Sequence, residues 1–246
     1  MGKIRTYGLI GYPLGHSFSP KFFEEKFSSE GIVDAQYLSF PLEKIDDFPK
    51  LIASYNLRGL NVTLPYKRLI IPFLDELSQI ARETQAVNCI VFKGKKLIGH
   101  NTDVLGFEKS LLPLIGIAKQ KALILGTGGA AQAVAYVLNN LAIPFKFVSR
   151  DADGEALSYS EALKSLKEYQ LIINTTPIGM SPELDQSPLE ELLGVGKKHL
   201  CYDLIYNPEK TCFLQMAEKK GAKIKNGLEM LEIQALESWK LWQDFV

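Results

Sequence analysis

The hydrophobic positions of this chain form short apolar runs that alternate with helix-like segments. In the first half, each strand-like run is followed by a segment with the spacing of an amphipathic helix. Such alternation is typical of an α/β fold with a mainly parallel sheet. We expect strands at 4–11, 35–40 and 57–64, a hairpin over 86–101, and helices at 20–31, 42–55 and 66–83.

The second half repeats this alternation after a helix expected over 102–114. Residues 122–125 are apolar in succession, as in a parallel strand that is covered on both faces. Because ligands of open α/β sheets bind beyond the carboxyl ends of the strands, we expect two α/β domains with the active site in the cleft between them. Further strands are expected at 143–148, 171–177, 199–206 and 222–226.

A glycine-rich turn follows the strand at 122–125. Gly126, Gly128 and Ala131 match the pattern G-x-G-x-x-G/A in the order strand, turn, helix. The first glycine permits a tight turn, the second leaves room for a ligand, and the alanine lets the helix pack closely. Amide groups at the helix start can then face a pyrophosphate. The pattern predicts a dinucleotide site, and a tight turn without a ligand is the alternative.

The residues after the next strand bear on the choice of nucleotide. Ser149, Arg150 and Asp151 stand about 20 residues past the turn, where such folds read the adenosine ribose. An arginine accommodates a 2′-phosphate, and its charge-assisted hydrogen bond is worth roughly 1.5–3 kcal/mol. Asp151 opposes that gain by repulsion. The sequence favours NADP, with NAD as the alternative.

Composition and charge narrow the class of ligand. Acidic and basic residues balance at 28 each without a basic block, so neither nucleic acid nor an anionic membrane is an expected partner. No stretch has the length of a spanning helix or the pattern of a signal peptide, which predicts a cytoplasmic protein. The three cysteines and three histidines are scattered, so no metal site is expected.

The stretch LNVTLPYK at 60–67 carries the most chemistry in the first half. Asn61 and Thr63 lie two residues apart at a strand end, hence on one face. A helix that starts at Tyr66 would place Lys67 in its first turn, against the helix dipole. A lysine in that position is a candidate proton donor or acceptor, and a charge carried into solvent on a long stem is the alternative.

Other polar residues have both a structural and a functional interpretation. Asp103 starts a helix, so it is either an N-cap or the carboxylate that holds Lys67 for proton transfer. Ser19 before Pro20 has the pattern of a helix cap, whereas Ser17 stands in a loop where a hydroxyl binds backbone or ligand. Gln234 borders the apolar stripe of the last helix and is either a rim residue in water or a partner of buried polar groups. That stripe comprises Leu228, Leu231, Ala235, Leu236, Trp239 and Trp242.

Taken together, these stretches resemble the shikimate dehydrogenase family over nearly the whole chain. The motifs GYPLGHSFSP, NVTLPYK, AVNCIV, NTDVLGF, LGTGGAAQA, NTTPIGM, YDLIYNP and GLEMLEIQA follow that family's order and approximate spacing. The resemblance implies that domain 1–101, completed by the helix 228–246, binds shikimate. It implies that domain 102–227 is Rossmann-like and binds NADP, and that the enzyme serves chorismate and aromatic amino acid biosynthesis in the cytoplasm.

The resemblance also implies roles for individual residues. Lys67 and Asp103 would be the catalytic pair: hydride reaches the ketone carbon of 3-dehydroshikimate while the lysine protonates the developing alkoxide. The substrate would be bound by Ser17, Ser19, Asn61, Thr63, Lys67, Asn88, Asp103, Tyr206 and Gln234. The cofactor would contact Gly126, Gly128, Gly129, Ala130, Ser149, Arg150, Thr175, Leu204, Gly227 and Met230.

Three features depart from the family's pattern. Asp151 follows Arg150 where a further basic residue is usual nearby, the segment 153–167 is short for a helix plus a strand, and Glu229 replaces a small residue. Two other functions stay open, namely a quinate/shikimate dehydrogenase that uses NAD and a dinucleotide-binding sensor without catalysis. The sequence leaves open whether the protein is a monomer or a homodimer.

Overall fold

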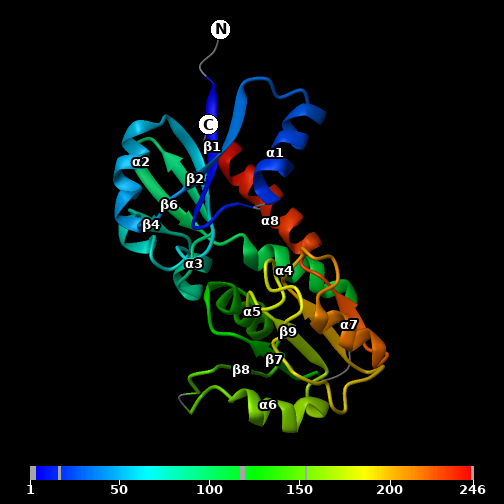
Figure 1. The fold of residues 1–246 in the computed structure, drawn as a ribbon. Helices are drawn as coiled ribbons and strands as arrows, with labels where there is room; N and C mark the ends of the chain where they lie inside the picture. Colours follow the sequence, from blue (N-terminus) through cyan, green and yellow to red (C-terminus); the bar gives the residue numbers. More distant parts are fainter. Residues whose placement is uncertain (1–3, 16–17, 117–119, 153, 245–246) are drawn as a thin grey trace. The chain divides into compact units, whose positions relative to one another are not determined.

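The structure is a computed structural model that describes residues 4–15, 18–116, 120–152 and 154–244. The chain forms two compact α/β units, each built around its own sheet, which confirms the expected fold class (Figure 1). Unit 1 comprises Met1–Leu105 and Gln234–Val246, and unit 2 comprises Gly106–Ile233. Both boundaries fall inside helices, α4 (Asp103–Leu111) and α8 (Leu228–Gln243), whereas the sequence predicted domain boundaries after residues 101 and 227.

Unit 1 contains a mixed sheet with the strand order β2-β1-β3-β5-β6-β4. The pairs β1–β2, β1–β3 and β4–β6 are parallel, whereas β3–β5 and β5–β6 are antiparallel, so the expected hairpin is present. The strands are β1 (Arg5–Gly11), β2 (Ala35–Pro41), β3 (Leu57–Val62), β4 (Glu76–Leu77), β5 (Cys89–Lys93) and β6 (Lys96–His100). The helices are α1 (Phe18–Ser29), α2 (Phe48–Ser54), α3 (Gln79–Thr84) and the 3-10 turns Ile45–Asp47 and Ile71–Phe73.

The two faces of this sheet are covered by different helices. Side chains alternate along β5, so Ile90 faces a core shared with Phe48 of α2, whereas Cys89 and Val91 face the opposite side. That second core contains aromatic side chains of α1 together with Trp242 of α8. The C-terminal helix therefore completes the core of unit 1 by packing on the face that α1 also covers.

The helix expected over 66–83 is wrong. Turns follow β3 instead, and the segment then forms a 3-10 turn, the short strand β4 and the helix α3. Pro72 lies inside the expected helix, where it would remove one backbone hydrogen bond and clash with the preceding turn. Strand β4 pairs with β6, and Ser78 caps α3 by accepting from the Ala81 amide at 3.2 Å. Lys67 accordingly lies in a turn, so no helix dipole acts on it as the sequence suggested.

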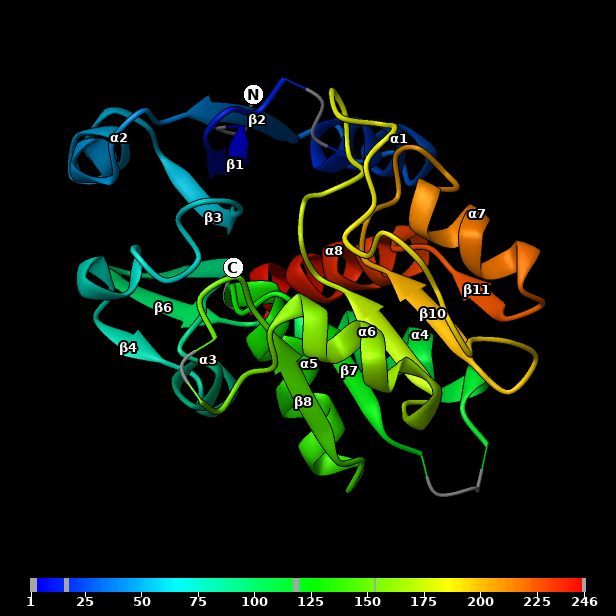
Figure 2. The same cartoon turned by 60° about the horizontal axis from the view of Figure 1, so that its bottom comes forward.

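Unit 2 contains a five-stranded parallel sheet with the order β11-β10-β9-β7-β8 (Figure 2). The strands are β7 (Ala122–Leu125), β8 (Phe145–Val148), β9 (Leu171–Asn174), β10 (Leu200–Asp203) and β11 (Lys223–Lys225). This is the Rossmann order 3-2-1-4-5-6, in which the described residues form an isolated bridge between Val148 and Leu157 in place of the outer third strand. The helices are α5 (Gly129–Asn140), α6 (Tyr159–Ser165), α7 (Cys212–Lys219) and the 3-10 turns Leu112–Leu114 and Leu166–Glu168.

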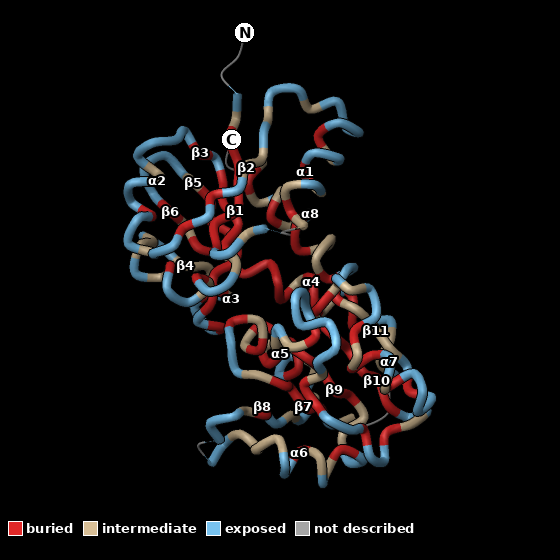
Figure 3. The backbone as a smooth tube through the Cα atoms, in the orientation of Figure 1, coloured by how far each residue is buried: buried red, intermediate tan, exposed pale blue. Residues whose placement is uncertain are grey.

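Burial follows the expected layering, with the middle strands of both sheets buried and the outer sides of the helices exposed (Figure 3). The apolar stripe expected on α8 is partly wrong, because Leu228 and Leu236 are exposed. The buried positions of the second half of α8 are Gln234, Ala235, Ser238 and Trp242, which have helical spacing but include two polar residues. Among the described residues, no helix is long and apolar enough to cross a membrane.

Candidate active site

The centre of the candidate site in unit 1 is an ion pair between Lys67 and Asp103. The Lys67 Nζ atom donates to Asp103 Oδ2 at 2.7 Å, and the two side chains are only 17% and 8% exposed. Lys67 comes from the turn after β3, and Asp103 is the first residue of α4. One interpretation of the sequence took Asp103 as the N-cap of this helix. That interpretation is wrong, because Asp103 is already part of the helix. The partly exposed lysine can exchange a proton with a ligand while the carboxylate holds it in place.

Asn88 fixes the position of this carboxylate by contacting the oxygen atom that Lys67 does not bind. Its Oδ1 atom accepts from the Thr102 backbone amide at 2.7 Å, and this unambiguous donor sets the orientation of the side-chain amide. The Nδ2 atom consequently points at Asp103 Oδ1, at 2.9 Å. It also lies 3.2 Å from Gln234 Oε1 and 2.9 Å from Thr102 Oγ1. Asn88 thus joins the carboxylate to the last helix of the chain.

Gln234 and Ser238, one turn apart on α8, complete this buried cluster. Gln234 is 5% exposed, so the rim position considered for it in water is wrong. The Ser238 hydroxyl donates to the Gln234 carbonyl at 2.9 Å and lies 3.1 Å from Thr102 Oγ1. The side chains that the motifs place far apart in sequence therefore meet in one hydrogen-bonded cluster within unit 1.

Asn61 is the link between this cluster and β2. Its Nδ2 atom donates to the Asn88 carbonyl at 3.2 Å and to Ser238 Oγ at 2.9 Å. Its Oδ1 atom accepts from the Tyr37 hydroxyl at 2.9 Å. Both amide hydrogens of Asn61 already have protein acceptors, so toward a ligand the side chain retains an oxygen lone pair.

Ser19 is buried within α1, which starts at Phe18, so its interpretation as a cap before the helix is wrong. Burial raises the pKa of Tyr37 well above its usual value, and a hydrogen bond with Ser19 acts in the opposite direction.

The Thr63 hydroxyl, at the end of β3, has no hydrogen-bond partner in the described part of the chain, which leaves it available to a ligand. Ser17 lies outside the described residues.

The glycine-rich turn in unit 2 fits a dinucleotide. Gly126 has φ +104°, and a Cβ atom there would lie 2.9 Å from Thr175 Oγ1, so the turn itself requires glycine. Gly128, by contrast, has no atom within 4 Å of the place where its Cβ would be. It is the N-cap residue of α5 and, as a glycine, has no side chain that could accept from the first amides of the helix. These amides have no partner inside the helix. The space and the free donors, which reach Gly129 and Ala130, suit a phosphate.

The expected ribose-binding residues follow β8. Ser149 Oγ accepts from the Asp151 amide at 3.2 Å, which shapes a tight turn. The exposed Arg150 forms no ion pair with another described residue. Burial raises the pKa of Tyr159, and the charge of Arg150 acts in the opposite direction. The guanidinium is therefore available to an anion. In the segment that the sequence suggests is short for a helix plus a strand, the described residues form the bridge at Leu157 and the helix α6.

Of the remaining expected cofactor residues, Thr175 and Leu204 directly follow β9 and β10, Gly227 follows β11, and Met230 lies on α8. The Thr175 hydroxyl donates to the Leu125 carbonyl at 2.6 Å and so ties β9 to the glycine-rich turn. A Cβ atom on Gly227 would lie 2.0 Å from the Leu204 carbonyl oxygen, so these two backbones are in direct contact. Tyr206 is half-buried in the same segment as Leu204, and Met230 is buried on α8. Glu229, the unusual residue of GLEM, pairs with Lys225.

A known enzyme is similar to this protein over almost the whole chain. The shikimate dehydrogenase (NADP(+)) of Carboxydothermus hydrogenoformans is 38% identical over 98% of this chain and 92% of the relative. The chain belongs to the shikimate dehydrogenase family. The family model described as shikimate dehydrogenase substrate binding domain matches residues 9–90. The shikimate dehydrogenase (NADP(+)) of Caldicellulosiruptor saccharolyticus is 40% identical over 97% of this chain and 92% of its own length.

A solved structure extends the similarity to the fold. Shikimate 5-dehydrogenase from Thermus thermophilus, crystallised in complex with NADP(H) and shikimate, superposes with a TM-score of 0.86 at 30% identity. The match covers 99% of this chain and 95% of that enzyme. The fold of this chain is therefore that of shikimate dehydrogenase over nearly its whole length.

Three residues of the hydrogen-bonded cluster in unit 1 were not predicted as site residues from the sequence, namely Thr102, Ser238 and Tyr37. Thr102 is visible only as part of NTDVLGF, and Ser238 follows Gln234 by one helical turn, which was a usable signal. Tyr37 gives no local signal, since a tyrosine in a strand is ordinary core. Among the described residues, no cluster of His, Cys, Asp and Glu could hold a metal ion.

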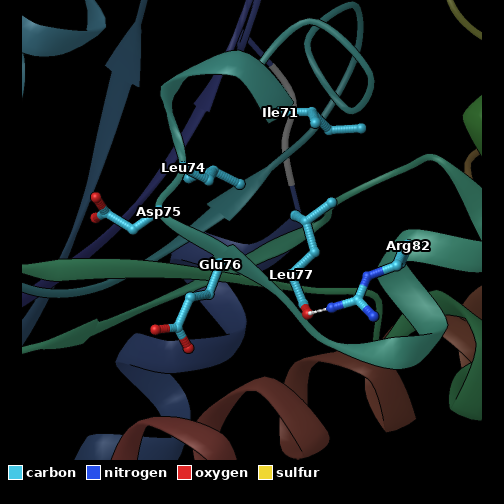
Figure 4. Close-up of a pocket in the computed structure, with 6 residues that line it drawn as sticks. All are labelled: Ile71, Leu74, Asp75, Glu76, Leu77 and Arg82. Carbon is cyan, nitrogen blue, oxygen red and sulfur yellow. Dashed lines mark hydrogen bonds between the residues drawn. The ribbon is translucent and has the colours of Figure 1, made fainter.

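A surface hollow of unit 1 is a separate feature. It has a volume of about 460 Å³ and is lined by Ile71, Leu74, Asp75, Glu76, Leu77 and Arg82 (Figure 4). Arg82 closes one side by donating to the Leu77 carbonyl at 3.2 Å. None of the expected site residues that the structure describes lines this hollow, so it is not the candidate site.

Proposed function

We propose that this protein is an NADP-dependent shikimate dehydrogenase, which reversibly reduces 3-dehydroshikimate to shikimate in chorismate biosynthesis. The observation that carries the proposal is the 2.7 Å ion pair between Lys67 and Asp103, with Asn88 behind the carboxylate, in a member of this family. An oxidoreductase that acts on a CH–OH group needs a proton donor and acceptor beside the oxygen, and Lys67 has the required chemistry.

The two units are assigned different ligands. Unit 1 binds the substrate, which is supported by the match of residues 9–90 to the family's substrate-binding domain. Unit 2 binds NADP, with Gly126, Gly128, Gly129 and Ala130 at the pyrophosphate, and Ser149, Arg150 and Thr175 nearby. Leu204, Gly227 and Met230 line the nicotinamide pocket. When bound, NADPH supplies the hydride that reduces the ketone.

Lys67 stabilises the oxygen of the reacting carbonyl and gives it a proton as negative charge develops there. Asp103 holds the lysine by accepting from Nζ, so the ammonium stays in one position instead of moving through solvent. In the reverse direction, Lys67 in its neutral amine form takes the hydroxyl proton of shikimate and becomes the ammonium again. Asn88 keeps the carboxylate oriented toward the lysine throughout, because its amide is itself fixed by the Thr102 backbone.

The other polar residues of unit 1 bind the hydroxyls and carboxylate of a small triol acid. Thr63 contributes a free hydroxyl, Asn61 an oxygen acceptor, and Asn88 and Gln234 side-chain amides; Ser17 and Ser19 complete the set in this unit. Tyr206, which belongs to unit 2, stays a prediction for the carboxylate. Many fixed donors and acceptors favour a polyhydroxylated substrate, because an analogue without a hydroxyl would leave a buried group unpaired.

A steady-state assay of the purified protein with shikimate and NADP⁺ tests this proposal. We expect NADPH to form, and its absence with both NADP⁺ and NAD⁺ would show that the assignment is wrong. Quinate in place of shikimate distinguishes the dual-specificity enzyme, which would turn over both acids. A sensor without catalysis would bind the nucleotide and turn over neither acid.

A further inference from the structure

Asp203 is a buried carboxylate that the proposed mechanism does not use. It is the last residue of β10 in unit 2, and no part of the residue is exposed to solvent. No lysine, arginine or histidine of the described chain forms an ion pair with it. A buried carboxylate without a cation is costly unless hydrogen bonds satisfy its oxygens, so its partners must account for it.

Three donors from three different segments converge on this carboxylate. Asp203 Oδ1 accepts from Asn174 Nδ2 and from the Ile205 backbone amide, each at 3.0 Å. Asp203 Oδ2 accepts from the Thr211 hydroxyl at 2.6 Å. Because a carboxylate only accepts, and can accept along several directions, it suits a point where only donors meet. Asp203 therefore joins the end of β9, the segment after β10 and the start of α7.

The orientation of the Asn174 side chain makes the arrangement directional. Its Oδ1 atom accepts from the Thr176 backbone amide at 3.0 Å and from the Thr176 hydroxyl at 2.7 Å. Since the backbone amide can only donate, the Nδ2 atom must face Asp203. The same residue accepts through its carbonyl from the Leu204 amide at 3.0 Å. Asn174 and Asp203 thus hold consecutive amides of the segment 204–206.

The segment held in this way is the one that contacts Gly227. The Gly227 amide donates to the Ile205 carbonyl at 3.0 Å, and the Leu204 carbonyl oxygen fills the place of the missing Cβ. Leu204 and Gly227 are both expected at the nicotinamide pocket. A shift of the segment by a fraction of an ångström would therefore move both of these pocket residues together.

We propose that Asp203 is a positioning residue of the nucleotide site, whose carboxylate fixes the segment 204–206 where the nicotinamide end of NADP binds. The inference rests on the proposed function, because it assumes that unit 2 binds NADP. Asp203 does not touch the cofactor in this proposal. It acts through the Ile205 amide and, by way of Asn174, through the Leu204 amide.

The experiment compares two nucleotides on the full-length protein by titration calorimetry. NADP⁺ carries the nicotinamide, whereas 2′-phosphoadenosine 5′-diphosphoribose lacks it. We expect Asp203→Ala to weaken NADP⁺ binding about fivefold to tenfold, because buried donors lose their acceptor and the segment shifts. Binding of the ring-less nucleotide should stay within about twofold. A purely structural role would instead weaken both nucleotides equally or neither, and either result would overturn the proposal.

Two variants serve as controls. Asp203→Asn keeps an oxygen for the Ile205 and Asn174 donors, so it should restore NADP⁺ binding to within about twofold of the wild type. Tyr202→Phe removes the hydroxyl that lies 2.8 Å from Ser110 Oγ, a buried hydrogen bond of the preceding residue that does not involve the segment. It should leave both nucleotide affinities unchanged, and a loss as large as that of Asp203→Ala would contradict the specific role.

A third variant covers the case in which Asp203→Ala does not fold. Thr211→Val removes one donor but keeps the carboxylate, and we expect NADP⁺ binding about threefold weaker with the ring-less nucleotide unaffected; unchanged NADP⁺ binding overturns the proposal. The failure of the proposed function has a different signature, because wild-type protein would then neither bind NADP⁺ nor oxidise shikimate. A wild type that does both, with Asp203→Ala indistinguishable from it, refutes only the role of Asp203.

Discussion

Two buried carboxylates of this protein, Asp103 in unit 1 and Asp203 in unit 2, have opposite surroundings. Asp103 pairs with Lys67 at 2.7 Å and has the Asn88 amide at its other oxygen. Asp203 meets only neutral donors, namely an amide side chain, a backbone amide and a hydroxyl. The carboxylate of Asp103 holds the Lys67 ammonium, whereas that of Asp203 holds one backbone amide and two side-chain donors.

The difference extends to the cations of the two units. In unit 1 the acid and the base are partners, so the charge of Lys67 is fixed in place but still partly open to a ligand. In unit 2 the exposed Arg150 and the buried Asp203 are not paired, and the described residues offer neither of them an ion-pair partner. A paired cation suits proton transfer at a defined atom, whereas an unpaired one is free to neutralise an anion.

The comparison is tested most strongly by Lys67→Ala. Removal of the proton donor should lower kcat by about 10²–10⁴-fold, while shikimate affinity measured by calorimetry changes less. Lys96→Ala is the matched control, because Lys96 also pairs with a carboxylate of unit 1, Glu76, but lies exposed. Retained turnover in Lys67→Ala would show that Lys67 does not transfer the proton. The ion pair of Lys67 with Asp103 would then have a structural role alone.

The second test uses the pH dependence of stability. Burial raises the pKa of Asp203 from 3.8 to about 6, while its hydrogen bonds from Thr211, Ile205 and Asn174 act in the opposite direction. The folded state therefore holds this proton more tightly than the unfolded chain, so the stabilisation is complete below pH 3.8 and is lost as the pH rises through about 6.

Asp203→Asn lacks this titration. Relative to it, the wild type should lose about 2 kcal/mol of unfolding free energy between about pH 4 and about pH 7. Urea unfolding of both proteins across that range measures the difference. A constant difference would mean that Asp203 binds its proton equally well in the folded and unfolded states, contrary to its burial among neutral donors.

Arg150→Ala tests the unpaired cation of unit 2. We expect NADP⁺ binding to weaken about tenfold and NAD⁺ binding to stay nearly constant, because only NADP⁺ carries the 2′-phosphate that a free guanidinium binds. Asp151→Ala should act in the opposite direction, since it removes a repulsive charge. Equal loss of both nucleotides in Arg150→Ala would place the arginine elsewhere than at the 2′-phosphate.

The smallest effect is expected from Tyr37→Phe, which removes the donor to Asn61. Shikimate KM should rise about threefold with little change in kcat, because one neutral hydrogen bond is lost behind the site. Tyr7→Phe is the matched control: Tyr7 is the register partner of Tyr37 on β1 and also lies against Trp242, but its hydroxyl accepts from Gln243. Equal effects of the two variants would show that the Asn61 contact has no special role.

The parts of the site that depend on neighbouring residues were readable from the sequence. The turn at Gly126 and the close packing of the fully buried Ala131 follow from a local strand–turn–helix pattern, and the structure confirms both. The pairing of Lys67 with Asp103 was also one of the two interpretations of Asp103, and the structure shows this pair. The separate argument that a helix dipole acts on Lys67 was wrong. Pro72 inside the expected helix was a local signal against that helix, and the pairing of β4 with β6 is a non-local one.

Residue types and local spacing in the sequence determined the α/β class, the strands of unit 2, the glycine-rich turn and the residues available for chemistry. Apart from the Lys67–Asp103 pair, which was among the predictions, the tertiary structure decided which of these residues meet. Asn61 and Ser238 are 177 positions apart and yet hydrogen-bonded, and Asp203 gathers donors from three segments. Periodicity reports which face of an element is buried, whereas the partner of a buried polar group depends on contacts between distant elements.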